Sequence, residues 1–338
     1  MNNKKILIAT GIYPPKIGGP AQYAKNLKEA FEKMGHEVSI KTFSIENHIP
    51  TGLRHIFFFF KIIPSLLKAN MIFALDTYGT GFPTVFASKL FFRKCVIRTG
   101  GDFLWEQYCE RHKRKVLLKG FYQTEKINFS LKEKIIFLVT KWTLRNASKI
   151  IFSTEWQRDI FLKAYKLNIE KTRIVENYYG PKESDMDYES KIFISSSRNL
   201  VVKNSKTLRE IFEEIKRSQN GIFLFDGRLP YNDFMEKMKK CFCVITVSVS
   251  EVSPNIILDA IRCGRPFICT KEVGIYERIK EAGVFVDPLN GEEIKEAVSN
   301  LLTEEGYAEA KEKVRNFNFV HNWGDIAEEF IQTSNIKK

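Results

Sequence analysis

Residues Ser248–Arg278 read SVSEVSPNIILDAIRCGRPFICTKEVGIYER, and this stretch decides the fold that the sequence predicts. Proline is favoured in the first turn of a helix, so we expect a helix to begin near Pro254. Its apolar residues recur at spacings of three and four, which indicates one buried face. Gly264 is expected to end this helix. The apolar segment FICT that follows it predicts a short buried strand.

Two acidic residues stand in this stretch at positions suited to binding a polar ligand. Glu251 lies in the loop before the expected helix, and Asp259 lies nearly two turns inside it. The start of a helix presents unpaired N–H groups and the positive end of the dipole, which suit a phosphate or a polar sugar. An ordinary solvated helix flanked by surface acids explains the spacing equally well.

The whole block resembles the donor-sugar motif of family 4 glycosyltransferases, usually written E-G-x-P-N-x-x-L-E-A-x-A-x-G-x-P-V-I-A-T. Here it reads E-V-S-P-N-I-I-L-D-A-I-R-C-G-R-P-F-I-C-T. The chain departs from the pattern at Val252, where glycine is usual, and at Asp259, where glutamate is usual. The resemblance implies that Glu251 binds the donor sugar and Asp259 the ribose hydroxyls. It also implies that Pro254, Asn255 and Ile256 line the donor.

The resemblance implies a GT-B fold, in which two Rossmann-like α/β/α domains face a cleft and a C-terminal helix returns to the first domain. The expected boundaries follow a polar connector at 180–190. Residues 1–180 form the N-terminal, acceptor-side domain, and residues 181–320 form a shortened nucleotide-sugar-binding domain. Residues 321–338 form the returning helix.

A strand, a glycine loop, a helix and a second strand are predicted at 4–9, 17–20, 21–34 and 37–43. A glycine pair at a helix start allows a close approach by an anion, although it is more often a plain turn. The segment resembles the family's opening loop, I-Y-P-P-x-x-G-G-x-x-x-Y. That likeness implies that Gly18 and Gly19 face the donor diphosphate and that Tyr13 lies on the acceptor side.

The strand predicted at 95–99 ends in G-G-D-F-L-W-E. The carboxyl ends of parallel strands line the ligand crevice in such sheets, so Asp102 is well placed for chemistry. The alternative is that Asp102 only caps the next helix. The segment resembles the G-D-[YF]-x-W-E of some bacterial members of the family, which implies that Asp102 faces the reacting sugar and that Glu106 contacts the acceptor.

Arg198 and Lys203 stand five residues apart in S-R-N-L-V-V-K-N. This loop resembles the family's G-R-L-x-x-x-K-G. An arginine offers a fork of donors and a lysine a mobile point charge, which are two ways to hold a diphosphate. Taken alone, the two residues would be ordinary surface charges. The resemblance makes Arg198 and Lys203, with Asp102 and Glu251, the expected catalytic set.

The implied function is that of a retaining glycosyltransferase of hexosyltransferase type. It would move a sugar from a nucleotide sugar to a hydroxyl of a glycan or lipid-linked acceptor, in cell-surface polysaccharide or lipopolysaccharide biosynthesis. The cations would stabilise the leaving diphosphate, so no metal and no cofactor is expected. The alternatives are a GT-B sugar-nucleotide epimerase, a donor-binding but inactive relative, and a non-catalytic basic nucleic-acid-binding protein. The chain has no recognised nucleic-acid motif, and its excess charge avoids the second domain.

Net charge is distributed unevenly along the chain. Residues 1–189 contain 31 Lys and Arg against 18 Asp and Glu, which leaves +13, while residues 190–338 contain 22 of each. Within 111–134, eight basic and two acidic residues are interleaved with apolar ones. This segment is either a solvated helical face or a surface for an anionic membrane. We therefore expect a cytoplasmic protein bound peripherally to the inner face of the cell membrane.

Six cysteines are scattered along the chain, and the N-terminus is expected to run directly into a strand without a signal peptide. We interpret the cysteines as reduced. The pair Cys241 and Cys243 opens an apolar strand with no nearby histidine, so packing is expected there rather than a metal site.

Overall fold

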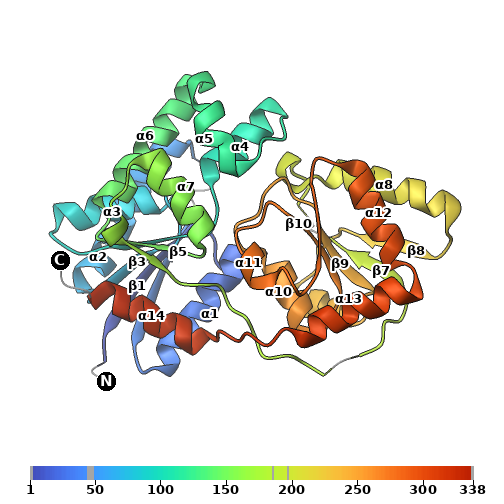
Figure 1. The fold of residues 1–338 in the computed structure, drawn as a ribbon. Helices are drawn as coiled ribbons and strands as arrows, with labels where there is room; N and C mark the ends of the chain where they lie inside the picture. Colours follow the sequence, from blue (N-terminus) through green and yellow to red (C-terminus); the bar gives the residue numbers. More distant parts are fainter. Residues whose placement is uncertain (1–2, 44–48, 185, 196–197, 336–338) are drawn as a thin grey trace. The chain divides into compact units, whose positions relative to one another are not determined.

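The computed structural model describes residues 3–43, 49–184, 186–195 and 198–335. The chain divides into two compact units, each built on its own sheet (Figure 1). The first unit comprises residues 1–104, 125–177 and 322–338. The second comprises residues 105–124 and 178–321.

The first unit contains a sheet of six strands in the order β2-β1-β3-β4-β5-β6. Its strands are β1 (Lys5–Thr10), β2 (Glu37–Thr42), β3 (Met71–Ala74), β4 (Val96–Thr99), β5 (Lys149–Phe152) and β6 (Thr172–Ile174). All neighbouring strands run parallel. The central strands are continuous apolar runs because helices cover both faces of a parallel sheet. Those helices are α1 (Gly19–Lys33), α2 (Thr51–Lys68), α3 (Gly81–Leu90), α6 (Leu131–Asn146), α7 (Glu155–Tyr165) and α14 (Trp323–Asn335).

The last helix, α14, packs against α1 of the first unit. The Tyr23 and Trp323 rings lie 5.1 Å apart, and those of Phe31 and Phe330 lie 6.4 Å apart. Phe330 is fully buried. The predicted return of the C-terminal helix to the first domain is confirmed.

The second unit contains a parallel sheet of five strands in the order β11-β10-β9-β7-β8. Its strands are β7 (Lys191–Ile194), β8 (Ile222–Phe225), β9 (Cys243–Thr246), β10 (Phe267–Thr270) and β11 (Val284–Val286). Its helices are α5 (Leu118–Thr124), α8 (Ser205–Ser218), α9 (Tyr231–Lys239), α10 (Asn255–Arg262), α11 (Tyr276–Ile279), α12 (Gly291–Leu301) and α13 (Glu304–Asn316), together with most of α4 (Phe103–His112). Two parallel sheets covered by helices confirm the predicted α/β class with two Rossmann-like domains.

The helix predicted from the opening stretch is confirmed as α10, which begins directly after Pro254. Gly264 follows its end with a φ of 64°, a left-handed conformation that glycine adopts without strain. The segment FICT is the fully buried strand β10. Cys241 and Cys243 are fully buried in the two apolar cores of the unit, and burial raises the pKa of the Cys241 thiol to about 12. Both residues therefore serve packing.

Three parts of the fold differ from what local sequence patterns indicate. Helix α2 continues through Pro64, which lies in its final turns, where only one backbone hydrogen bond is lost. Helix α13 was not predicted because its buried residues are few and small. The segment Trp105–Thr124 groups with the second unit, although its position in the sequence placed it in the first.

Among the residues that the structure describes, no helix is long and apolar enough to cross a membrane.

Candidate functional site

The site is centred on two opposite charges in the second unit. The Nζ atom of Lys203 contacts the Oε1 atom of Glu251. The same carboxylate oxygen accepts a hydrogen bond from Ser248 Oγ at 2.7 Å. The side chains of Lys203 and Glu251 are only 11% and 14% exposed. The sequence predicted that both residues bind one donor molecule, and the structure brings them together.

Lys203 is held by a tight turn that follows β7. Residues Val201–Lys203 form a 3-10 turn, and Asn204 then adopts a φ of 55° before α8 begins. Asn204 Nδ2 donates to Pro288 O at 2.7 Å. Val249 N donates to Val202 O at 2.8 Å, which ties this turn to the segment after β9. The lysine is therefore positioned by strand ends rather than by a free loop.

Glu251 is held by the loop that follows β10. Its N–H donates to Glu272 O, and its C=O accepts from Gly274 N, both at 2.9 Å. The carboxyl ends of β7, β9 and β10 thus supply Lys203, Glu251 and their supports, which is the edge where α/β sheets bind ligands.

Helix α4 brings two further acids to this turn. Glu106 Oε2 lies 3.7 Å from Arg198 Nη1, and the Glu110 carboxylate accepts from Val201 N–H. The following residues are also attached here, since Leu118 N donates to Ser250 Oγ at 3.0 Å. Glu106 was predicted on the acceptor side, and in the structure its carboxylate pairs with a residue expected to bind the donor.

The first turn of α10 contains the other residues expected at the donor. Pro254 is buried, Asn255 is exposed and Ile256 is half-buried. Val252, which replaces the usual glycine, is 6% exposed, so its side chain packs inward. The departure from the family pattern at this position is accommodated by burial in the unit.

Asp259 belongs to a largely buried cluster of charged side chains on and beside α10. Its Oδ1 lies 3.7 Å from Arg262 Nη2 and accepts a hydrogen bond from Tyr231 OH at 3.5 Å. Arg262 Nε in turn lies 3.3 Å from Glu183 Oε1. Burial raises the pKa of Asp259 to about 6, and the positive charge of Arg262 opposes that rise. Asp259 therefore changes charge close to physiological pH.

Sequence reasoning missed Arg262, Tyr231 and Glu183. Arg262 follows Asp259 by three residues, a spacing that places two side chains on the same helical face, so it was detectable. Tyr231 lies 28 residues away, and Glu183 stands in the connector expected between the domains. No local pattern indicates either contact.

Four predicted residues belong to the first unit. Gly18, with a φ of 154°, accepts backbone hydrogen bonds from Ala21 and Gln22 at the start of α1, of which Gly19 is the first residue. Tyr13 is half-buried in the preceding turn. Asp102 is 4% exposed and directly precedes α4. All four lie near the carboxyl ends of β1 and β4, where the sequence placed them.

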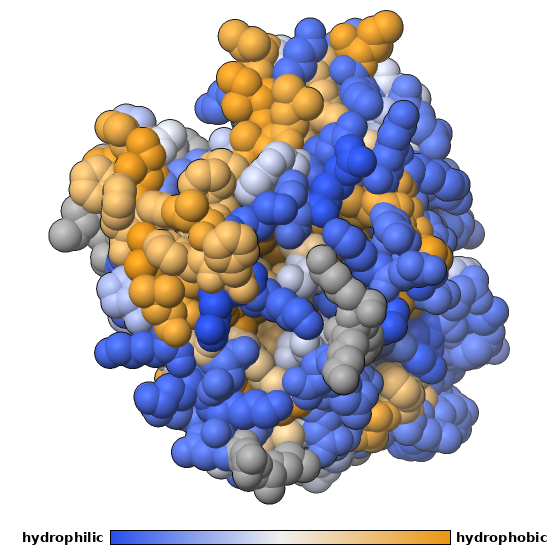
Figure 2. Space-filling model, turned by 90° about the vertical axis from the view of Figure 1, so that its left-hand side faces the viewer, coloured by the Kyte–Doolittle hydropathy of each residue, from blue (hydrophilic) through white to orange (hydrophobic). Residues whose placement is uncertain are grey.

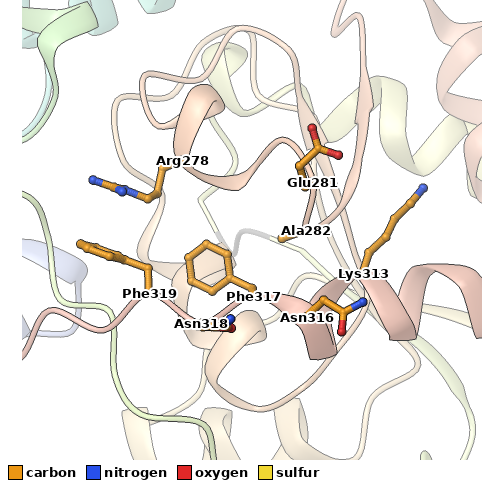
Figure 3. Close-up of a pocket in the computed structure, with 8 residues that line it drawn as sticks. All are labelled: Arg278, Glu281, Ala282, Lys313, Asn316, Phe317, Asn318 and Phe319. Atoms are coloured by element: carbon orange, nitrogen blue, oxygen red, sulfur yellow. The ribbon is translucent and has the colours of Figure 1, made fainter.

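A cavity of about 260 Å³ in the second unit is lined by other residues (Figure 3). Arg278 lies over the Phe319 ring, 4.0 Å from its centroid. Glu281, Lys313 and Phe317 also line the cavity. It holds none of the predicted site residues.

Comparison with known proteins finds similarity in the segment that contains Lys203 and Glu251. Residues 196–304 match the model of the family described as glycosyl transferases group 1. A curated relative from Methanocaldococcus jannaschii, named as the uncharacterized glycosyltransferase MJ1607, is 23% identical over 98% of both chains.

Solved structures share the whole fold. WaaG, a glycosyltransferase involved in lipopolysaccharide biosynthesis, superposes with a TM-score of 0.67 at 14% identity, covering 98% of this chain and 99% of its own. HepE from Anabaena in complex with UDP-glucose gives a TM-score of 0.66 at 15% identity, with 98% and 99% covered. A Listeria monocytogenes protein assigned as a UDP-N-acetylglucosamine 2-epimerase gives 0.63 at 13% identity, with 98% and 95% covered. The fold by itself is therefore common to transferases and epimerases.

The matched segment 196–304 contains Arg198, Lys203, Glu251 and Asp259. This part of the chain therefore carries the signature of the group 1 glycosyl transferases, within a chain whose fold is of the GT-B type.

Proposed function

We propose that the protein is a retaining glycosyltransferase of hexosyltransferase type that uses a nucleotide-sugar donor. The observation that carries the proposal is the shielded contact between Lys203 and Glu251, with Ser248 donating to the same carboxylate. A nucleotide sugar carries an anionic diphosphate and a sugar with hydroxyl groups. The ammonium group of Lys203 would bind the diphosphate, and the carboxylate of Glu251 would accept hydrogen bonds from the sugar hydroxyls.

In this proposal Arg198 and Lys203 bind the diphosphate, Glu251 the sugar and Asp259 the ribose. Pro254, Asn255 and Ile256 border the donor, and Gly18 and Gly19 approach the diphosphate from α1. As the bond between the anomeric carbon and the phosphate oxygen breaks, negative charge grows on the leaving diphosphate, and the two cations stabilise it. The acceptor oxygen bonds to the same face of that carbon, and its proton passes to the leaving phosphate.

Asp102, Glu106 and Tyr13 are proposed to orient the acceptor. The acceptor would be a glycan or a lipid-linked sugar used in cell-surface polysaccharide or lipopolysaccharide biosynthesis, and lipopolysaccharide biosynthesis is the process in which WaaG is involved. A lipid-linked acceptor requires the enzyme to work at the inner face of the cell membrane, as a cytoplasmic peripheral protein.

The first experiment identifies the donor by thermal shift with UDP-, GDP- and ADP-sugars. A ligand present at a hundred times its Kd stabilises the folded state by about 2.7 kcal/mol, which is readily detected as a rise in Tm. UDP-sugars are the first choice because HepE was solved with UDP-glucose. A chain that none of these donors stabilises would contradict the proposal.

Product analysis then separates a transferase from an epimerase. A transferase joins the sugar to an added acceptor, and proton NMR of the product should show the anomeric configuration of the donor retained. An epimerase releases free sugar and nucleotide with no acceptor present. Rapid acceptor-independent release would therefore favour the epimerase.

A further inference from the structure

Helix α2 is apolar on two opposite sides. One side, with Phe58, Ile62 and Leu66, is completely buried against the first unit. The other side carries Phe57 and Phe60, which are 58% and 65% exposed. A soluble surface helix normally has one apolar side facing the core and a polar side facing water. The outer side of α2 therefore needs a partner that the first unit itself does not supply.

Helices α3 and α6 continue the same exposed surface. The Phe59 ring of α2 lies 5.6 Å from that of Phe86 on α3, and Phe86 lies 6.0 Å from Trp142 on α6. Figure 2 looks onto this side of the first unit and shows apolar side chains gathered into a patch with hydrophilic ones around it. We define the α2–α3–α6 face by its exposed members Leu53, Ile56, Phe57, Phe60, Leu67, Phe86, Leu90, Phe92, Leu131, Ile135 and Leu138.

The exposed apolar area of this face is larger than the largest apolar patch on a typical monomeric protein. Each of its large side chains is between 45% and 96% exposed. Since a large aromatic side chain offers 150–250 Å² in total, the face presents apolar surface on the order of 1,000 Å². The largest apolar patch on a typical monomer is roughly 300–600 Å².

Among the described residues of 49–101 and of α6, the exposed charged side chains are all basic. Residues 49–101, which include α2 and α3, contain seven Lys and Arg and a single acid. That acid, Asp76, accepts hydrogen bonds from the backbone N–H groups of Tyr78, Thr80 and Gly81. The acid of α6, Glu133, is fully buried. Exposed cations on or beside these helices are Lys68, Lys89, Lys94, Lys132, Lys134 and Arg145.

An apolar centre with a cationic rim favours an anionic bilayer, rather than a second copy of the chain, as the partner of this face. Two copies meeting through this face would bring two cationic rims together, which is unfavourable. A bilayer with anionic headgroups offers apolar chains to the centre of the face and negative charge to its rim.

The basic segment 111–134 offers such a surface only at its end, where residues 131–134 belong to α6. Its apolar residues Leu118, Phe121 and Phe129 are buried, so they are not available to lipid. Ile127 and Leu131 are exposed, and Leu131 is already a member of the α2–α3–α6 face. The basic run at 111–115 belongs to the second unit, where Lys115 Nζ donates to Thr207 Oγ1 at 2.7 Å. The membrane contact expected through 111–134 is therefore proposed only for residues 131–134, which belong to the α2–α3–α6 face.

We propose that the first unit docks on an anionic bilayer through the α2–α3–α6 face. The membrane location rests on the proposed function, because a lipid-linked acceptor needs an enzyme at the bilayer. The choice of face rests only on the exposed side chains and charges of the first unit.

The test uses the full chain and vesicles of phosphatidylcholine with none or about a third of phosphatidylglycerol. Two triple variants are compared: Phe57→Ser, Phe60→Ser, Leu138→Ser on the face, and Ile169→Ser, Phe223→Ser, Leu289→Ser, which are not members of it. All six residues are exposed, so both variants should fold. We expect the wild type and the second variant to bind anionic vesicles equally, and the first to bind at least tenfold more weakly.

A charge series gives an independent comparison. Changing Lys68, Lys89, Lys132 and Lys134 to Gln should weaken binding at least tenfold. Changing Arg111, Lys113, Arg114 and Lys115 to Gln removes the same charge from elsewhere and should weaken it less than threefold. A larger loss in the second set, or unchanged binding in the face variants, would overturn the proposal.

Trp142 reports the orientation of the bound protein. Vesicles with brominated acyl chains should quench tryptophan fluorescence in the wild type, and most of that quenching should disappear in Trp142→Phe. Undiminished quenching would mean that another surface is inserted. A wild type that ignores vesicles but dimerises, with the face triple variant monomeric, would make the face an interface between copies. Donor thermal shifts in the same variants should be unchanged, so failure here is distinguishable from failure of the proposed activity.

Discussion

Lys203 and Glu251 hold opposite charges together where little water reaches them. If Lys203 and Arg198 stabilise the leaving diphosphate, replacing either by Ala removes a charge that matters most in the transition state. We expect kcat to fall by roughly a hundredfold, or about 3 kcal/mol. Steady-state kinetics with the identified donor measures this effect.

A matched control for these variants is Lys206→Ala. Lys206 lies on α8 three residues beyond Lys203, but its side chain is 89% exposed and pairs with Glu210 at 3.8 Å. Its removal should leave kcat unchanged. Normal turnover in both Arg198→Ala and Lys203→Ala would rule out the diphosphate clamp.

Asp259 should make donor binding depend on pH. Burial raises the pKa of this carboxyl from 3.8 to about 6, so the residue is mostly neutral at pH 5 and mostly ionised at pH 7. An ionised carboxylate accepts hydrogen bonds from ribose hydroxyls more strongly. Calorimetry with a UDP-sugar should therefore show affinity rising between pH 5 and 7. The donor diphosphate keeps its charge over this range, so the rise would report the ionisation of Asp259.

Substitutions at Asp259 test the assignment. Asp259→Asn should bind donor more weakly than the wild type at pH 7 and lose the pH dependence, whereas Asp259→Glu should retain most of both. Equal donor binding by all three proteins would leave Asp259 as part of a structural cluster with Arg262.

The raised pKa of Asp259 also affects stability. As pH rises, the unfolded chain releases this proton before the folded chain does, so the contribution of Asp259 to folding stability decreases from about pH 4 to pH 6.

At the scale of elements, α6 begins with a complete capping box. Ser130 N and Oγ donate to Glu133 Oε2 at 2.7 and 2.8 Å, and Glu133 N donates back to Ser130 Oγ at 3.4 Å. Losing such a cap costs about 1 kcal/mol. Ser130→Ala should therefore accelerate amide hydrogen exchange in the first turn of α6 roughly fivefold, as measured by mass spectrometry.

The control for that variant is Ser218→Ala at the exposed end of α8, where the hydroxyl donates to Ile215 O at 3.0 Å. A surface change of this kind is usually neutral within about 0.5 kcal/mol. Unchanged exchange in α6 of Ser130→Ala would show that tertiary packing, rather than the cap, determines where this helix begins.

At the scale of the whole molecule, the excess charge of +13 lies entirely in residues 1–189. Exposed charges interact over a Debye length that shortens from about 30 Å at 0.01 M salt to about 3 Å at 1 M. Vesicle binding should therefore fall steeply with added salt. Donor binding should change much less, because Lys203 is only 11% exposed.

Co-sedimentation and calorimetry over the same salt series check this contrast. Vesicle binding that is insensitive to salt would assign docking to the apolar side chains alone. A donor affinity that falls as steeply as vesicle binding would indicate an open, surface-bound nucleotide.

The sequence alone predicted strands β1, β4 and β10, helix α10 and the loops that carry Lys203 and Glu251. These follow from local rules: β1 and β10 are short apolar runs, and α10 begins after Pro254 and ends before Gly264. The likeness to a long motif supplied the expected roles. Local patterns fail where the signal is weak, as in α13, where the buried residues are few and small.

Only the tertiary structure decided which distant segments meet and which apolar residues stay in water. Glu110 contacts Val201 across 91 residues, and Tyr231 reaches Asp259 across 28. Both Phe58 and Phe57 are apolar residues of one helix, yet one is fully buried and the other is 58% exposed. Sequence periodicity marks a residue as apolar, but its burial depends on whether another part of the chain covers it, and that is settled only when the helices pack.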